Sequence, residues 1–185
     1  MVIRMTPDEE RHVQEFKERI GYDAPVSREE LKNALEGAMK DRGLYLYFIW
    51  KALKKLHPEI DADHILAEAM HNYGLYKSNY MGCVENAMDG MLNQSSKNGM
   101  IVFEQEFTAL SEDYAEKHIH NCPLINAFRE VGATPEEIMT LCPKILGPSD
   151  AGILEPFSDK VELSFPKTLS TDDVCIMCVK KKTDS

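Results

Sequence analysis

The spacing of apolar residues changes once along the chain, and this change constrains the fold more than any other feature. Before the polar segment Asn93–Gly99, apolar residues recur every three or four positions, which is the spacing of one helix face. After this segment they alternate with polar residues, as in Val161, Leu163 and Phe165, which is the spacing of a strand. The pattern predicts an α+β fold, in which an N-terminal helical layer packs on a small antiparallel β-sheet with additional short helices.

We expect a single domain over residues 1–185, because a chain of 185 residues falls within the usual size of one domain. Its mainly helical part spans residues 1–95. The part with strands and short helices spans residues 100–182 and carries the cysteine, histidine and aspartate residues that could perform chemistry.

Capping boxes mark where several helices begin. Thr6–Glu9, Ser27–Glu30 and Thr134–Glu137 each combine a hydroxyl residue with a glutamate three positions later. Asp61 is expected to begin a helix, and Tyr80–Leu92 is expected to form another. The segment Asn93–Gly99 is predicted to be a loop.

Strands are predicted at Met100–Ala109 and Tyr114–Asn121, which would form a hairpin, and at Val174–Val179, whose apolar character suits a central strand. A helix is expected to begin at Cys122-Pro123. Pro143–Pro148 is predicted to be an irregular link, after which Ser149 would cap a last short helix.

Net charge and apolar run length exclude several classes of partner. The chain has 21 Lys and Arg against 31 Asp and Glu, a net charge of -10, which repels nucleic acid and anionic lipid. Its longest apolar run, Leu44–Trp50, is far shorter than the roughly 20 residues of a membrane-spanning helix. The same run is apolar enough to form a homo-oligomer interface. The first ten residues lack the apolar core of a signal peptide, and five cysteines suit a reducing compartment, so a cytoplasmic location is expected.

The most informative motif is His118-Ile119-His120-Asn121-Cys122-Pro123. In a strand, alternate side chains share a face, so His118, His120 and Cys122 would point the same way. Cys122 would then lie at the beginning of a helix, where unpaired backbone N–H groups and the helix dipole lower a thiol pKa. Three interpretations follow. Cys122 is a nucleophile with a histidine as base, or the three residues form part of a divalent-metal site, or a buried cysteine lies beside two solvent-facing histidines.

Other candidate residues give weaker indications of a function. Cys175 and Cys178 form a CxxC pattern, but within a strand their sulfurs would face opposite sides, so a zinc knuckle is not expected. Asp150 follows the Pro-rich link and would lie in the first turn of a helix. The chain has no P-loop, GxGxxG or GxSxG motif, and therefore no nucleotide cofactor is expected.

Four features of the C-terminal half form a pattern: the run from His120 to Gly132, GATPEEIMTLC ending at Cys142, Asp150 seven residues before Phe157, and FPKTLSTDDVC ending at Cys175. In this pattern the chain resembles the family of L-2-amino-thiazoline-4-carboxylic acid hydrolases. The resemblance spans roughly Asp41–Lys181 and is sharpest over Asn121–Cys178.

The resemblance implies hydrolytic opening of a small cyclic amidine or amide ring to a carbamoyl-cysteine-type product. It implies that Cys122, Asp150 and His120 act in catalysis, with His118 as another possible proton shuttle. It also implies that Arg42 and Cys175 contact the substrate, with Arg42 pairing with a carboxylate. The metal candidates remain His118, His120 and Cys122.

A second hypothesis is a small-molecule or metal-sensing domain without hydrolytic activity. The arrangement is also similar to vinyl-reductase-type domains, which bind small molecules without hydrolysing them. Decay of ring absorbance in the presence of the thiazoline carboxylate would separate an enzyme from a binding domain.

Overall fold

The computed structural model describes residues 6–21 and 23–182 and has the predicted α+β architecture. The chain divides into two compact units, residues 1–33 and 34–185. The first unit contains helix α1 (Pro7–Ile20) and the first turns of α2 (Arg28–Leu56). Both arms of the predicted Ser27–Glu30 capping box are present, at 2.8 and 3.1 Å. The glutamate side chain of the predicted Thr6–Glu9 box lies outside the described residues.

The second unit combines helices with a small sheet. The helices and helical turns after α2 are α3 (Ala62–Ser78), α4 (Ala87–Gln94), α5 (Lys97–Val102), α6 (Pro123–Glu130), α7 (Pro135–Met139), the π-helical η1 (Thr140–Leu146), α8 (Gly147–Leu154) and the 3-10 turn η2 (Glu155–Phe157). The strands are β1 (Gln105–Leu110), β2 (Tyr114–Ile119), β3 (Val161–Lys167) and β4 (Cys175–Lys181). Within the described residues the strands form one antiparallel sheet in the order β1-β2-β4-β3. The prediction of β4 as a central strand is therefore confirmed.

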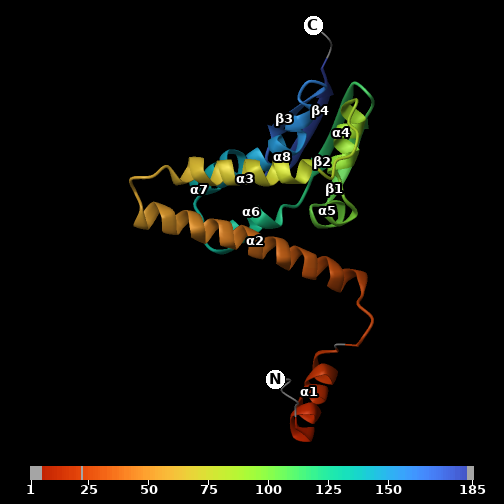
Figure 1. Ribbon diagram of the computed structural model, residues 1–185, viewed down its shortest axis with the longest axis vertical. Coiled ribbons are helices and arrows are strands. Elements are labelled where there is room, and N and C mark those ends of the chain that lie inside the picture. Colours follow the sequence, from red (N-terminus) through yellow and green to blue (C-terminus); the bar gives the residue numbers. More distant parts are fainter. Residues whose placement is uncertain (1–5, 22, 183–185) are drawn as a thin grey trace. The chain divides into compact units, whose positions relative to one another are not determined.

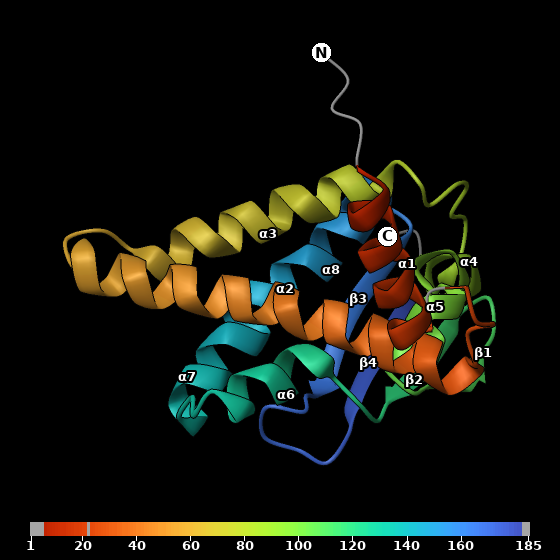
Figure 2. The same ribbon diagram turned by 90° about the horizontal axis from the view of Figure 1, so that it is seen from below.

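Helices cover one face of this sheet. Along β2, Ala115, Lys117 and Ile119 are buried while the residues between them are more exposed, so the buried set faces the helices. Helices α4 and α8 pack on the central and outer strands, and α3 packs across α8 (Figures 1 and 2). The outer face of the sheet is therefore the more exposed one, and the inner face packs against the helices and can carry a site.

Two apolar clusters fill the interior of this unit. The first includes Trp50, Phe128 and Leu141 and joins α2, α6 and η1. The second includes Met91, Leu154 and Val179 and joins α4, α8 and β4. Strand β2 contributes to both clusters, with Ile119 in the first and Ala115 in the second, so Lys117 lies between them.

The segment between α3 and β1 differs from its prediction. The predicted helix Tyr80–Leu92 forms only from Ala87, because Gly82 has a φ of +67° and Asn86 caps a new helix by accepting from the Asp89 N–H. The predicted loop Asn93–Gly99 is mostly helical, since Ser96 caps α5 through the Gly99 N–H at 3.0 Å. The predicted strand at Met100 therefore begins only at Gln105.

The predicted irregular link Pro143–Pro148 is also wrong, because it is helical throughout. Pro143 lies inside the π-helix η1, which runs directly into α8. The wider π turn accommodates a proline that lacks an N–H donor. Ser149 therefore lies within a helix, and its hydroxyl donates to the Leu146 carbonyl at 2.8 Å instead of capping.

Candidate functional site

The inner face of the sheet carries a buried polar cluster made of Cys122, Cys142, Asp150, Cys175 and Lys117. The pKa of each member is shifted by at least one other member, which places their side chains close together. Four of the five were singled out from the sequence, and Lys117 was not. The three cysteines also pack against the first apolar cluster.

Five separate elements deliver these side chains, and Lys117 comes from β2. Cys122 is the N-cap of α6, with Pro123 at the first helical position as predicted. Cys142 lies in the π-helix, Asp150 in the first turn of α8, and Cys175 at the beginning of β4. The cluster therefore depends on tertiary packing rather than on one local motif.

Close packing between helices fixes the position of Asp150. Gly74 on α3 lies against the backbone of α8, and a Cβ atom added there would come within 2.2 Å of the Ser149 carbonyl oxygen. A Cβ atom at Gly152 would come within 2.4 Å of the His71 carbonyl oxygen. Only glycine at both positions allows this approach, which holds the helix that carries Asp150.

Asp150 is deeply surrounded by protein, although the residue keeps part of its surface accessible. Burial raises the pKa of its carboxyl group to about 6, and the nearby Lys117 ammonium partly opposes this rise. Its Oδ1 atom accepts a hydrogen bond from Gln94 Nε2 at 3.1 Å. A carboxyl with such a pKa can gain or lose a proton near neutral pH.

The thiols are held in their neutral form. Burial raises the pKa values of Cys142 and Cys175 to about 12, and raises that of Cys122. The backbone N–H groups of Leu124 and Ile125 oppose the rise at Cys122, but its sulfur makes no hydrogen bond that caps α6. The expected lowering of the Cys122 pKa by the helix N-terminus is therefore wrong, because burial outweighs it.

Lys117 is the charged member of the cluster and is only 2% exposed. Burial lowers the pKa of its ammonium, while Asp150 and Cys175 favour the charged form. Its Nζ atom donates to Ser95 Oγ at 3.2 Å. The sequence did carry a signal for this residue, because the alternation through Ala115 and Ile119 places residue 117 on the inner face.

The two histidines lie on the opposite face of the sheet. His118 Nε2 contacts Glu116 Oε1 at 3.1 Å, and His120 Nε2 lies 3.6 Å from Glu106 Oε2. Because β2 alternates, these rings point away from the face of Ile119, which pairs with Cys175. His118 and His120 do share a face as predicted, with ring centres 6.2 Å apart. The chain leaves β2 before Cys122 and enters α6, so Cys122 does not share this face.

Glu116 is the centre of a hydrogen-bond network on this outer face. Its carboxylate accepts from Thr108 Oγ1 at 2.6 Å and from the Tyr114 hydroxyl, and Cys178 Sγ lies 3.3 Å from that hydroxyl. These hydrogen bonds, with that of Thr108 the strongest, lower the pKa of Glu116. Cys178 and Cys175 face opposite sides of the sheet, as predicted for a CxxC pattern in a strand.

The contacts of Arg42 are with residues outside the cluster. It is exposed on α2, where its guanidinium donates to Met39 Sδ and to the Tyr73 hydroxyl, each at 3.3 Å. Its guanidinium carbon lies 5.7 Å from the centre of the Tyr73 ring. This contact gives Arg42 a role in joining α2 to α3.

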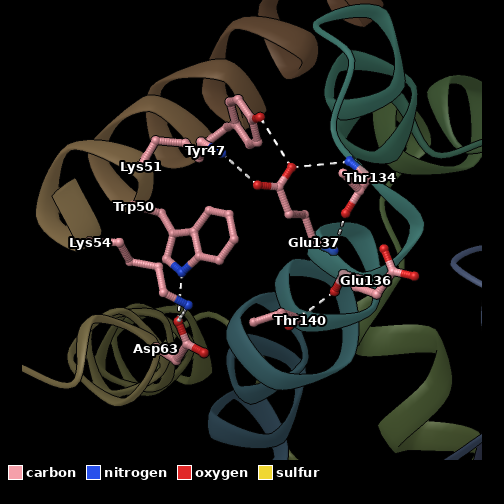
Figure 3. A network of polar contacts seen from close by, with 9 residues as sticks. All are labelled: Tyr47, Trp50, Lys51, Lys54, Asp63, Thr134, Glu136, Glu137 and Thr140. Carbon is pink, nitrogen blue, oxygen red and sulfur yellow. Dashed lines mark hydrogen bonds and ion pairs between the residues drawn. The ribbon is translucent and has the colours of Figure 1, made fainter. Parts of the chain in front are cut away.

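Two cavities open on the surface near α7. One of about 480 Å³ lies beside Trp50 and is bordered by hydrogen-bonded carboxylates (Figure 3). Glu137 accepts from Lys51 Nζ at 2.6 Å and from the Thr134 N–H at 3.0 Å, and Asp63 accepts from Trp50 Nε1 at 2.6 Å. These contacts join α2, α3 and α7 and account for the polar groups seen there.

The second cavity, of about 460 Å³, lies between η1 and the loop that follows β3. It is lined by Glu136, Met139, Thr140, Pro143, Lys144, Thr168, Ser170 and Thr171. The Ser170 side chain is close enough to Cys142 to lower that thiol's pKa against the larger effect of burial. This cavity therefore lies next to the buried polar cluster.

No group of three or more His, Cys, Asp or Glu side chains within residues 6–21 and 23–182 is arranged to hold a metal ion. Across the same residues, no helix is both long and apolar enough to cross a bilayer. No family model matches this chain, and no curated protein matches it.

Proposed function

We propose that this protein is a hydrolase that opens a small cyclic amidine ring, with Asp150 as the base that activates water. The observation that carries the proposal is the position of Asp150, which is buried among Cys122, Cys142, Cys175 and Lys117 while the residue keeps some accessible surface. The resemblance of residues 121–178 to the L-2-amino-thiazoline-4-carboxylic acid hydrolases supports the choice of substrate.

The proposed reaction adds one water molecule to the ring. The water oxygen bonds to the ring carbon that lies between sulfur and nitrogen, and Asp150 accepts the water proton. The bond from that carbon to the ring nitrogen then breaks, and the nitrogen takes up a proton to become an amine. The product is a carbamoyl-cysteine, and no oxidant or reductant is consumed.

Cys122 is proposed to shape the site, not to attack the ring. Burial raises its thiol pKa, so the nucleophilic thiolate is scarce at neutral pH. The histidines lie on the other face of the sheet and contact carboxylates there, so Asp150 is better placed than His118 or His120 to accept the proton.

The test is to incubate the protein with 2-amino-thiazoline-4-carboxylate and to measure the gain of one water by mass spectrometry. Asp150→Asn should reduce kcat at least about 100-fold, the usual scale for loss of a general base. The exposed Asp159→Asn serves as the matched control and should leave kcat unchanged. Full activity of Asp150→Asn would remove Asp150 from the mechanism.

Cys122→Ala separates the two mechanisms. If water attacks directly, this variant should keep at least about a tenth of the activity, because it loses only packing. If Cys122 is the nucleophile, the variant should fall to the background rate. Binding of the thiazoline carboxylate without any turnover would favour the small-molecule binding domain instead.

A further inference from the structure

Helix α2 carries apolar side chains on two opposite faces. Its inner face holds Gly43, Tyr47 and Trp50, which are buried. Helices α3 and α6 lie along this side of α2 (Figure 1). The outer face carries large apolar side chains that are 50–73% exposed, namely Tyr45, Phe48, Ile49 and Leu56. Single exposed apolar residues are common on protein surfaces, but a contiguous row of them marks an interaction surface.

This outer row has the spacing of a seam between two helices. Two series with a seven-residue period run along it, the first being Ala38, Tyr45 and Ala52 and the second Asp41, Phe48 and Lys55. All six residues are exposed. A seven-residue repeat keeps one face of a helix against a partner helix along its length. The alanines let two helices approach closely, and Tyr45 and Phe48 supply apolar surface at the middle.

The two charged residues of the row indicate which partner fits it. Asp41 and Lys55 each lie seven residues from Phe48, in opposite directions along α2. Within residues 6–21 and 23–182, neither has an ion-pair partner, unlike the neighbouring Lys51, which pairs with Glu137 at 2.6 Å. The face thus has an apolar centre, an acid on one side and a base at the same distance on the other. Such a face is complementary to a copy of itself that is turned by 180°.

We propose that α2 packs antiparallel against α2 of a second copy of this chain, about a two-fold axis that passes beside Phe48. In such a symmetric interface the same surface is used by both copies. The two Phe48 rings meet at the axis, and Asp41 of each copy faces Lys55 of the other, so that two ion pairs flank the apolar centre. Residues 34–56 form a helix about 35 Å long, which is the length of the seam.

A second copy fits this face better than a lipid surface or an unlike protein does. The net charge of -10 repels anionic lipid, and the row lacks the cluster of Lys and Arg that membrane-surface helices carry. An unlike protein would have to present the reverse order of charges, which a second copy presents by symmetry alone. Lys55 also borders the cavity beside Trp50, so the second copy would lie at the rim of that cavity.

Sedimentation equilibrium of the full chain tests the pairing. The wild type should have twice the mass of one chain at about 100 μM, where even a dimer with a micromolar Kd is formed. Phe48→Glu should be a monomer at the same concentration, because it brings two carboxylates together at the axis. Leu110→Glu, which changes an exposed apolar residue on β1, is the matched control and should remain a dimer. A monomeric wild type, or a dimeric Phe48→Glu, overturns the proposal.

Exchanging the two charges tests the antiparallel arrangement itself. Asp41→Lys and Lys55→Asp should each raise the Kd of the dimer at least about tenfold, because like charges then face each other. The double variant should return the Kd to within about threefold of the wild-type value, since both pairs form again with their signs reversed. Circular dichroism checks that each variant folds, and both residues are exposed, so the melting of the monomer should change little. Single variants that keep the wild-type Kd, or a double variant as weak as the single ones, overturn the arrangement.

Discussion

Asp150 links the ionisation of the site to the stability of the fold. Its carboxyl pKa is about 6 in the folded protein, above the ordinary value of 3.8. Below pH 4 the group is protonated in both folded and unfolded states, so it has no effect on stability. Between pH 4 and 6 the unfolded chain loses this proton first, and the free energy of unfolding falls by up to roughly 3 kcal/mol. The loss is complete about one pH unit above the folded-state pKa, near pH 7.

We therefore predict that Asp150→Asn gains stability relative to the wild type as pH rises. The amide has no proton to lose, and its oxygen can still accept from Gln94 Nε2. Urea unfolding at pH 4 and pH 7 measures the difference between the two proteins. An advantage that stays constant between these pH values would contradict the raised pKa.

The same carboxyl group predicts the pH dependence of activity. As a base, Asp150 acts only when ionised, so kcat/KM should rise with pH up to about 6 and then level off. The measurement is the initial rate of ring opening between pH 4.5 and 8. A profile that keeps rising towards pH 9 would instead point to a thiolate.

Thiol reactivity separates the exposed cysteine from the buried ones. Cys83 is exposed, whereas burial raises the pKa values of Cys122, Cys142 and Cys175 and keeps their thiols protonated. We predict that iodoacetamide labels Cys83 first, although its hydrogen bond to Glu85 raises its pKa as well. Peptide mapping after a short labelling at pH 7.5 checks this order, and Cys83→Ser should remove the fast phase. Rapid labelling of Cys122 would instead revive its role as a nucleophile.

At the scale of single residues, the sequence pointed to part of the buried polar cluster. Cys122, Asp150 and Cys175 were singled out from a resemblance to a hydrolase family, and Lys117 was visible only as a charge at an inward strand position. Cys122 was wrongly expected on the face of His118 and His120, because alternation applies only while the strand continues, and the chain turns into α6 after Asn121. No pattern in the sequence could show that burial would outweigh the helix N-terminus at Cys122.

At the scale of elements, the crossing of α3 and α8 predicts that replacing glycine by alanine lowers the stability, which is opposite to the usual effect in a helix. Alanine normally stabilises a helix by about 0.5–1 kcal/mol relative to glycine. Gly152→Ala should instead destabilise the protein by about 1–3 kcal/mol, because its Cβ atom would collide with the His71 carbonyl. It should also lower kcat by displacing Asp150.

Gly37→Ala is the matched control for this crossing. A Cβ atom at Gly37 meets nothing within 4 Å, so this variant should gain about 0.5–1 kcal/mol. Chemical denaturation of both variants measures the two changes. A gain in stability for both would mean that α3 and α8 are not tightly packed.

The capping box of α7 gives another prediction for an element. The Thr134 hydroxyl accepts from the Glu137 N–H at 3.3 Å, and the Glu137 carboxylate accepts from the Thr134 N–H. Thr134→Ala should cost about 1 kcal/mol of stability. Thr168→Ala is the control, because Thr168 lies in a loop and caps no helix. An unchanged unfolding midpoint for Thr134→Ala would contradict the role of this cap.

Helix beginnings were predictable because caps are local, and Ser27, Asp61 and Thr134 all cap as expected. The π-helix was not predictable, since Pro143 ordinarily breaks a helix and only the surrounding packing stabilises the wider turn. The short helix α5 was missed because it opens within a polar segment, where the Ser96 cap outweighs composition.

On the scale of the whole molecule, both apolar clusters belong to the unit of residues 34–185 and share β2. We predict that Phe128→Ala in the first cluster costs about 3–5 kcal/mol and Met91→Ala in the second about 2–5 kcal/mol. Because the sheet joins the clusters, each variant should shift one common unfolding transition.

Fluorescence of Trp50, the only tryptophan in the chain, reports on the first cluster, and circular dichroism reports on all helices. The two transitions should coincide in the wild type and in both variants. Separate midpoints for the two probes would show that the clusters unfold independently.

The uncompensated lysine gives a way to follow how this kind of protein evolves. A relative that lost the function of this cluster would no longer need an ammonium between the two apolar clusters. Residue 117 could then become valine or leucine, with a rise in melting temperature. The amino acid at position 117 should therefore distinguish relatives that keep the function from relatives that have lost it.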